Sequence, residues 1–122
     1  MESVLDLQGA LSRLDDDQVL LRELAEIFLG QAASLLEQIQ AAVRDADAKG
    51  LRQAAHALKG SAGTLGGTAV YACADRLEHM GRDGILGDSE AACATLKTDL
   101  ERFMAELRHL VACGAGGEGL RA

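Results

Sequence analysis

The sequence predicts an all-α fold, an antiparallel four-helix bundle with a short additional N-terminal helix. Three observations support this: the chain has no Pro in 122 residues, 48% of its residues are hydrophobic, and only 2% are aromatic. Ala and Leu dominate the apolar set and favour helices, whereas strands favour β-branched and aromatic side chains. A chain of this length can bury one helical core without disulfides or a structural metal.

Apolar residues recur at helical spacing in the first third of the chain. A short helix is predicted to begin at Ser3, with Asp6 three residues later, and to extend to Leu14. The acidic run 15–17 suits the N-terminus of a second, long helix, where the helix dipole favours negative charge. This second helix is predicted to reach about Val43.

Glycines and capping residues divide the middle of the chain. Asp47 is expected to cap a third helix that runs to about Leu65, where Gly66 and Gly67 provide a stop. Thr68 is expected to cap a fourth helix. The short connections between these segments imply antiparallel neighbours, as in a helical bundle.

The last two helices each have one apolar side. The fourth is predicted to bury Val70, Cys73, Ala74, Leu77 and Met80 or Gly81, and residues 81–87 are expected to form a loop. The fifth opens at Asp88 or Ser89, and its apolar seam comprises Cys93, Leu96, Leu100, Phe103, Leu107 and Leu110. We expect a domain over residues 1–113 and a flexible Gly-rich tail over 114–122. The initiating Met1 and this tail favour an independent protein.

Charge and cysteine content exclude several classes of function. The net charge is −7, from 12 Lys and Arg against 19 Asp and Glu, so neither nucleic acid nor a membrane is an expected partner. The chain lacks an apolar run of about 18 residues and a secretory signal, which predicts a soluble cytoplasmic protein. Cys73, Cys93 and Cys113 form no CxxC or Cys/His cluster, so we expect reduced, buried thiols and no zinc site.

The third helix is predicted to place a histidine on its outer face. At about 100° per residue, the arc that faces the core comprises Leu51, Ala54, Ala55, Leu58, Ala62 and Leu65. His56 lies on the outer face with Lys59 beside it, and Gly60 and Gly63 follow one and two turns later. Because an interior Gly costs about 1 kcal/mol relative to Ala, we interpret both glycines as clearance for a docking protein that brings an anionic group to Nε2. An ordinary solvated His and Lys is the alternative.

The run from His56 to Gly66 reads HALKGSAGTLG. It resembles the H-x-L-K-G-S-x-x-x-L-G signature of histidine-containing phosphotransfer (HPt) domains, which relay phosphoryl groups between receiver domains in two-component signalling. The order of helices over residues 3–112 is also similar to that family. The resemblance implies that His56 is the phosphoacceptor at Nε2, that Lys59 is the charge partner of the phosphoryl group, and that Gly60 provides access.

One position departs from the family pattern. Many members carry a glutamine on the helix that follows, at the position that Glu78 occupies here. A carboxylate can accept a hydrogen bond from Nδ1–H and orient the imidazole, but it would oppose an incoming anion. The alternative pairs Glu78 with Arg82 at i+4, and Arg82 also lies where some relatives carry an arginine on the docking side. We expect docking through apolar surface near the histidine, with Leu14, Leu20 and Leu24 as contributors, although the spacing of Leu24 also suits the core.

The resemblance also implies a mechanism and partners. A phosphoryl group would pass in line from the aspartyl phosphate of one receiver to His56, and then to the aspartate of another. The expected partners of this monomeric chain are response-regulator receiver domains, a hybrid sensor histidine kinase, or both. Mg²⁺ would sit in the receiver's acidic pocket, so no cofactor or metal is expected here. Without a P-loop or other ATP-binding segment, the chain is predicted to be a phosphocarrier and not an enzyme with independent turnover.

Three alternatives fit parts of the sequence. The dimerisation helices of a sensor kinase would need an acidic residue directly after the histidine, where this chain has Ala57. A non-phosphorylated helical adaptor could bind receiver or kinase domains without using His56, but the intact motif argues against it. A haem or metal bundle would need inward-pointing ligands from facing helices, whereas His79 and His109 each stand alone.

Overall fold

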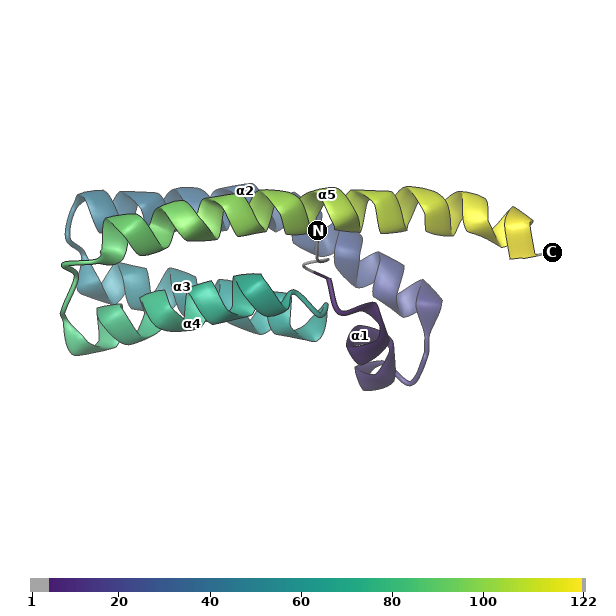
Figure 1. Ribbon diagram of the computed structural model, residues 1–122, viewed down its shortest axis with the longest axis horizontal. Helices are drawn as coiled ribbons and strands as arrows, with labels where there is room; N and C mark the ends of the chain where they lie inside the picture. Colours follow the sequence, from purple (N-terminus) through teal and green to yellow (C-terminus); the bar gives the residue numbers. More distant parts are fainter. Residues whose placement is uncertain (1–4, 122) are drawn as a thin grey trace.

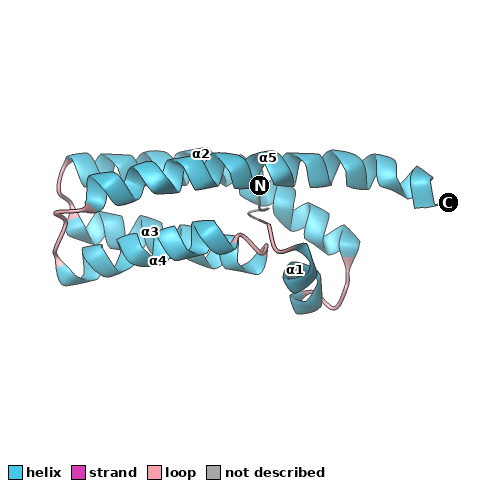
Figure 2. Cartoon of the chain, in the orientation of Figure 1, coloured by secondary structure: helices cyan, strands magenta, loops and turns pink. Residues whose placement is uncertain are grey.

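The computed structural model describes the backbone of residues 5–121 and the side chains of residues 5–112. Within this range the chain forms helices and turns without a strand (Figure 2). The helices are α1 (Leu7–Arg13), α2 (Gln18–Arg44), α3 (Ala48–Thr64), α4 (Thr68–Asp83) and α5 (Ser89–Arg121). The predicted all-α fold is confirmed.

The four longer helices form the bundle, with α2 and α5 lying along the shorter α3 and α4 (Figure 1). Contacts follow the ring α2–α3–α4–α5, so α3 and α5 are diagonal to each other. Helix α1 lies at the end of the bundle where α2 begins. The backbone N–H of Asp6 donates to the Gly66 carbonyl at 2.7 Å, which joins the start of α1 to the α3–α4 turn.

Aspartates begin the first three helices. The side chains of Asp6, Asp17 and Asp47 each accept a hydrogen bond from the backbone N–H three residues later, at 3.0, 2.9 and 2.9 Å. Such caps satisfy N–H groups that have no partner inside the helix. The expected cap of α3 is confirmed, and the acidic run 15–17 precedes α2 as predicted, with Asp17 as the cap. The cap of α1 is Asp6, whereas Ser3 lies outside the described residues.

The start of α4 differs from the prediction. Thr68 is the first helical residue and not the cap; the cap position belongs to Gly67, which makes no side-chain hydrogen bond. The reason lies in the preceding turn, where Gly66 adopts a left-handed φ of 79°. This turn brings Gly67 against the buried ring of Phe103, where a Cβ would lie 2.7 Å from the ring.

The end of α4 also differs, because the helix continues through Asp83 where the sequence predicts a loop from Gly81. Gly81 is a packing residue: a Cβ there would lie 2.6 Å from the Ala48 carbonyl oxygen and 2.7 Å from the Arg52 nitrogen. The missing side chain therefore lets the backbones of α3 and α4 approach each other. The helix ends at Gly84, which adopts a left-handed φ of 70°.

Helix α5 extends to Arg121, past the tail expected from Gly114. Its end projects beyond the other helices in Figure 1. No Pro interrupts this segment, and a helix that has already formed adds one hydrogen bond for each further residue. The division into a domain over residues 1–113 and a tail over 114–122 stays a prediction.

The core contains the residues that helical spacing selects. All six residues predicted to face inward from α3 are buried, and so are most of the α5 seam residues, with Leu110 half-buried. Cys73 and Met80 are also only half-buried, because they lie at the edge of the buried stripe of α4. The rings of Phe28 and Phe103 pack edge to face with centroids 5.4 Å apart. None of the described helices is long and apolar enough to cross a membrane.

Candidate functional site

The exposed face of α3 carries His56 beside α4. The His56 side chain is 70% exposed, and its Nδ1 lies 2.9 Å from Oε2 of Glu78, which is only 17% exposed. Among the described residues, Nε2 has no hydrogen-bond partner. The ring is therefore held from one side and open to solvent on the other.

The contact with Glu78 determines which ring nitrogen carries the proton. A hydrogen bond to Lys59 is the largest cause that lowers the pKa of Glu78, so its carboxylate is anionic near neutral pH. A carboxylate can only accept, so Nδ1 donates and carries the proton. In a neutral imidazole the lone pair is then on Nε2, which is the outward nitrogen. This arrangement produces an exposed nucleophile.

Lys59 lies behind the ring, against α4. Its Nζ is 2.6 Å from Oε1 of Glu78 and 3.3 Å from Oδ1 of Asp75. The hydrogen bond with Glu78 is also the main cause that raises the pKa of Lys59. The ammonium lies 5.8 Å from the centroid of the Tyr71 ring. Its positive charge is therefore shared with two carboxylates, and its expected role as the charge partner of the phosphoryl group stays a prediction.

The two glycines beyond His56 differ in their surroundings. A Cβ at Gly60 would meet nothing within 4 Å, so this position is open. A Cβ at Gly63 would lie 3.0 Å from Cδ2 and 3.2 Å from Cε2 of Tyr71. The surroundings of Gly60 fit the interpretation as clearance, but the space at Gly63 is occupied by Tyr71.

Comparisons with known proteins agree with this architecture. The family model of the Hpt domain matches residues 23–106. This chain belongs to the Hpt domain family. Its function is histidine phosphotransfer in two-component signalling, and family members are phosphotransfer carriers that interact with receiver domains and kinases and hold no cofactor of their own.

A solved HPt structure shares the fold. It is the crystal structure of histidine-containing phosphotransfer protein B (HptB) from Pseudomonas aeruginosa PAO1, which superposes with a TM-score of 0.78 and 22% sequence identity. The match covers 86% of this chain and 91% of the other. A search of the curated proteins finds no match.

Two α4 residues of this HPt domain were not predicted as site residues. Asp75 and Tyr71 precede Glu78 by three and seven residues, so they lie on the same side of the helix. The spacing relative to Glu78 is the signal that could have identified them. Arg82, by contrast, pairs with Asp83 at 3.5 Å and not with Glu78.

The expected apolar docking residues are less exposed than their neighbours. Leu14 and Leu24 are half-buried against the core, and Leu20 is also half-buried. Val19 and Ile27 on α2 are instead 54% and 55% exposed. Residues Leu24, Ile27, Phe28, Gln31, Ser61, Thr64 and Leu65 line a shallow cleft between α2 and α3.

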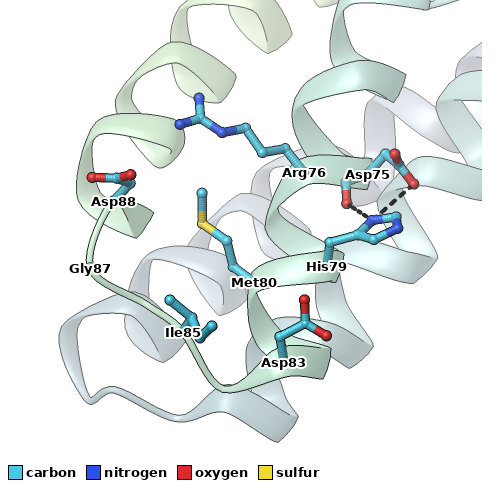
Figure 3. Close-up of a pocket in the computed structure, with 8 residues that line it drawn as sticks. All are labelled: Asp75, Arg76, His79, Met80, Asp83, Ile85, Gly87 and Asp88. Carbon is cyan, nitrogen blue, oxygen red and sulfur yellow. Dashed lines mark hydrogen bonds and ion pairs between the residues drawn. The ribbon is translucent and has the colours of Figure 1, made fainter.

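One hollow in the described part of the HPt domain has a lining that does not include His56. It has a volume of about 590 Å³ and lies between α4 and the connection to α5 (Figure 3). His79 enters this region, with Nδ1 2.7 Å from the Asp75 carbonyl oxygen and 3.4 Å from its Oδ1. No group of three or more metal-ligating side chains occurs among the residues that the structure describes.

The two cysteines whose side chains the structure describes are not partners of His56. Cys73 and Cys93 are free thiols, and the side chain of Cys113 lies outside the described part of the chain. Burial raises the pKa of Cys73 to about 11, assisted by a 3.4 Å hydrogen bond from its Sγ to Asp99. Burial also raises the pKa of Cys93. Both thiols are therefore protonated at neutral pH.

Proposed function

We propose that His56 is the phosphoacceptor, and that it relays a phosphoryl group between the aspartates of two receiver domains. The observation that carries this proposal is the exposed imidazole whose Nδ1 is bound to Glu78 while Nε2 is open. Gly60, one turn further on the same face, leaves space for the donor. His79, by comparison, is 47% exposed, and its Nδ1 lies 2.7 Å from the Asp75 carbonyl oxygen and not against a carboxylate from the neighbouring helix.

The transfer is an in-line displacement. The Nε2 lone pair attacks phosphorus, the bond between phosphorus and the aspartyl oxygen breaks, and the receiver's aspartate leaves as a carboxylate. Nδ1 keeps its proton, so the phosphorylated ring is cationic and its charge is balanced by Glu78. In the second transfer the aspartate of the next receiver attacks phosphorus, the bond between phosphorus and Nε2 breaks, and the imidazole is the leaving group.

Each neighbour of His56 has a separate role in this proposal. Glu78 orients the ring and keeps the proton on Nδ1. Lys59 holds Glu78 in place and supplies positive charge behind the ring, although its ammonium is shared with Asp75. Gly60 provides access for the donor. Phosphoryl transfer depends mainly on positioning and charge neutralisation, so these few groups are enough for the reaction.

The proposal extends to the setting of the reaction. The chain acts as a monomeric, cytoplasmic phosphocarrier without turnover of its own. Its partners are response-regulator receiver domains, a hybrid sensor histidine kinase, or both, and the Mg²⁺ required for transfer is held by the receiver. The residues Gly63, Arg82, Leu14 and Leu20 belong to the surroundings of the docking site and not to the reacting groups.

Labelling of the chain tests this proposal. Incubation with a phosphorylated receiver domain, and separately with the small donor phosphoramidate, should produce acid-labile, alkali-stable phosphate on the protein. The variant His56→Gln should lose this label, while His79→Gln and His109→Gln should keep it. Undiminished labelling of His56→Gln would overturn the assignment, and binding of the receiver without any label would favour an adaptor.

A further inference from the structure

Helix α3 has an unusual charge for this protein. It contains Lys49, Arg52 and Lys59 but no acidic residue, although the chain as a whole has a net charge of −7. Lys59 is shared between two carboxylates of α4, so its charge is already balanced. The other two cations of α3, Lys49 and Arg52, therefore form a local positive charge on a molecule that is acidic as a whole.

Lys49 and Arg52, which we call the cationic edge, are both exposed. Neither side chain forms a hydrogen bond or ion pair with the other residues that the structure describes. The nearest acids in sequence are engaged elsewhere: Asp47 caps the helix through the Gly50 N–H at 2.9 Å, and Asp45 pairs with Arg44 at 3.2 Å. The positive charge of the cationic edge is consequently available to a partner.

The cationic edge is aligned with the histidine. Arg52 and Lys49 precede His56 by four and seven residues, so they lie on the same side of α3, about 6 and 10 Å away along the helix axis. The backbone of Arg52 is also packed against Gly81 of α4, where a Cβ would lie 2.7 Å from the Arg52 nitrogen. This packing fixes the backbone of Arg52 relative to α4, which carries Glu78.

We propose that the cationic edge binds an acidic surface of the receiver domain that exchanges its phosphoryl group with His56. This inference rests on the proposed function, because that reaction brings an anionic phosphoryl group and the carboxylates around it to Nε2. Opposite charges beside the reacting atoms accelerate encounter and select orientation. Nucleic acid is a weaker candidate, because the rest of the chain would repel its phosphates.

Charge reversal of the cationic edge tests the inference. The double variant Lys49→Glu/Arg52→Glu is compared with Lys97→Glu/Arg108→Glu, whose positions are exposed on the diagonal helix α5. Both variants change the net charge by the same amount. A glutamate at position 49 suits the first turn of a helix, which favours folding, and Lys49→Gln/Arg52→Gln is the substitute if the reversed variant does not fold.

The readout is the second-order rate constant for labelling by a phosphorylated receiver, measured at low and high salt. We expect at least about a tenfold decrease for the cationic-edge variant at low salt, shrinking at high salt, and a much smaller decrease for the α5 variant. Labelling by phosphoramidate should decrease much less than labelling by the receiver, because this small anion feels the local charge but does not dock. The phosphoramidate experiment separates the two proposals. Loss of phosphoramidate labelling in His56→Gln tests the phosphoacceptor assignment independently of the role of the cationic edge.

Three results would overturn the inference. Equal decreases in the two variants would mean that only net charge matters. An unchanged rate in the cationic-edge variant would mean that the receiver docks elsewhere. Weaker binding of the variant to duplex DNA or to vesicles of anionic lipid, with transfer unaffected, would assign the cationic edge to a different partner.

Discussion

Replacing Gly60 with Ala should stabilise this protein and impair its function. The position is exposed in the interior of α3, and an added Cβ would meet nothing within 4 Å. Ala is therefore expected to increase the free energy of unfolding by about 1 kcal/mol, which is the difference in helix propensity. For a domain of this size the thermal midpoint should rise by about 3–5 °C.

Phosphotransfer should respond in the opposite direction. The new methyl group would project one turn from His56, in the space that the proposal assigns to the receiver. Small displacements of reacting groups cost up to about a hundredfold in rate, so we expect at least about a tenfold slower transfer from a phosphorylated receiver. Phosphoramidate, which is small, should label the variant at nearly the normal rate.

Gly30 provides a matched control for this experiment. It is an exposed interior glycine of α2 and also has open space around its missing Cβ. Gly30→Ala should raise stability by a similar amount in urea unfolding, with no effect on transfer. The reasoning is refuted if Gly60→Ala transfers as fast as the parent protein, or if it is destabilised while Gly30→Ala is stabilised.

Three further predictions follow from the surroundings of the site. Lys59→Met should raise the pKa of Glu78, measured by carboxyl NMR titration. Because the pKa of Glu78 is lowered on folding from its ordinary value of 4.5, the ionised carboxylate stabilises the fold above pH 4.5. The difference in free energy of unfolding between parent and variant should therefore shrink as the pH falls below 4.5. A difference that stays constant would contradict the interaction between Lys59 and Glu78. Gly66→Ala should destabilise the fold by about 2 kcal/mol or more in urea unfolding, because φ is +79° and the new Cβ would contact the Asp6 carbonyl oxygen; an unchanged midpoint would contradict this. At pH 8, iodoacetamide should label Cys73 far more slowly in the folded than in the urea-unfolded protein, since its pKa is raised to about 11; equal rates would count against the burial.

The helices and the outward position of His56 are predictable because they depend on local patterns. Asp47 and Gly66 define the ends of α3 through capping chemistry and a left-handed turn. The periodicity of Leu51 and Leu58 then determines which side is buried, and so which side carries His56. These properties follow from one segment of chain, without reference to its neighbours.

The partners of Lys59 and the role of Gly63 were not predictable in the same way. Both depend on the register of α4 against α3, which brings Tyr71 to Gly63 and two carboxylates to the lysine. Sequence spacing places Lys59 near His56 but does not show which way a long, flexible side chain turns. Gly81 is a further example, since a glycine that permits close helix packing has the same sequence signature as one that begins a loop.

The charges around His56 explain why the domain would carry a phosphoryl group without stabilising it strongly. Lys59 contributes one positive charge, while Glu78 and Asp75 contribute two negative charges. When Nε2 is phosphorylated and Nδ1 keeps its proton, the ring carries one positive charge. The net charge of the ring, Lys59, Glu78 and Asp75 together is then zero. None of their charge is then left to offset the phosphoryl oxygens, so that stabilisation must come from the partner and its metal ion. A site of this kind favours onward transfer, because the phosphoryl group gains its charge partners only while a receiver is bound.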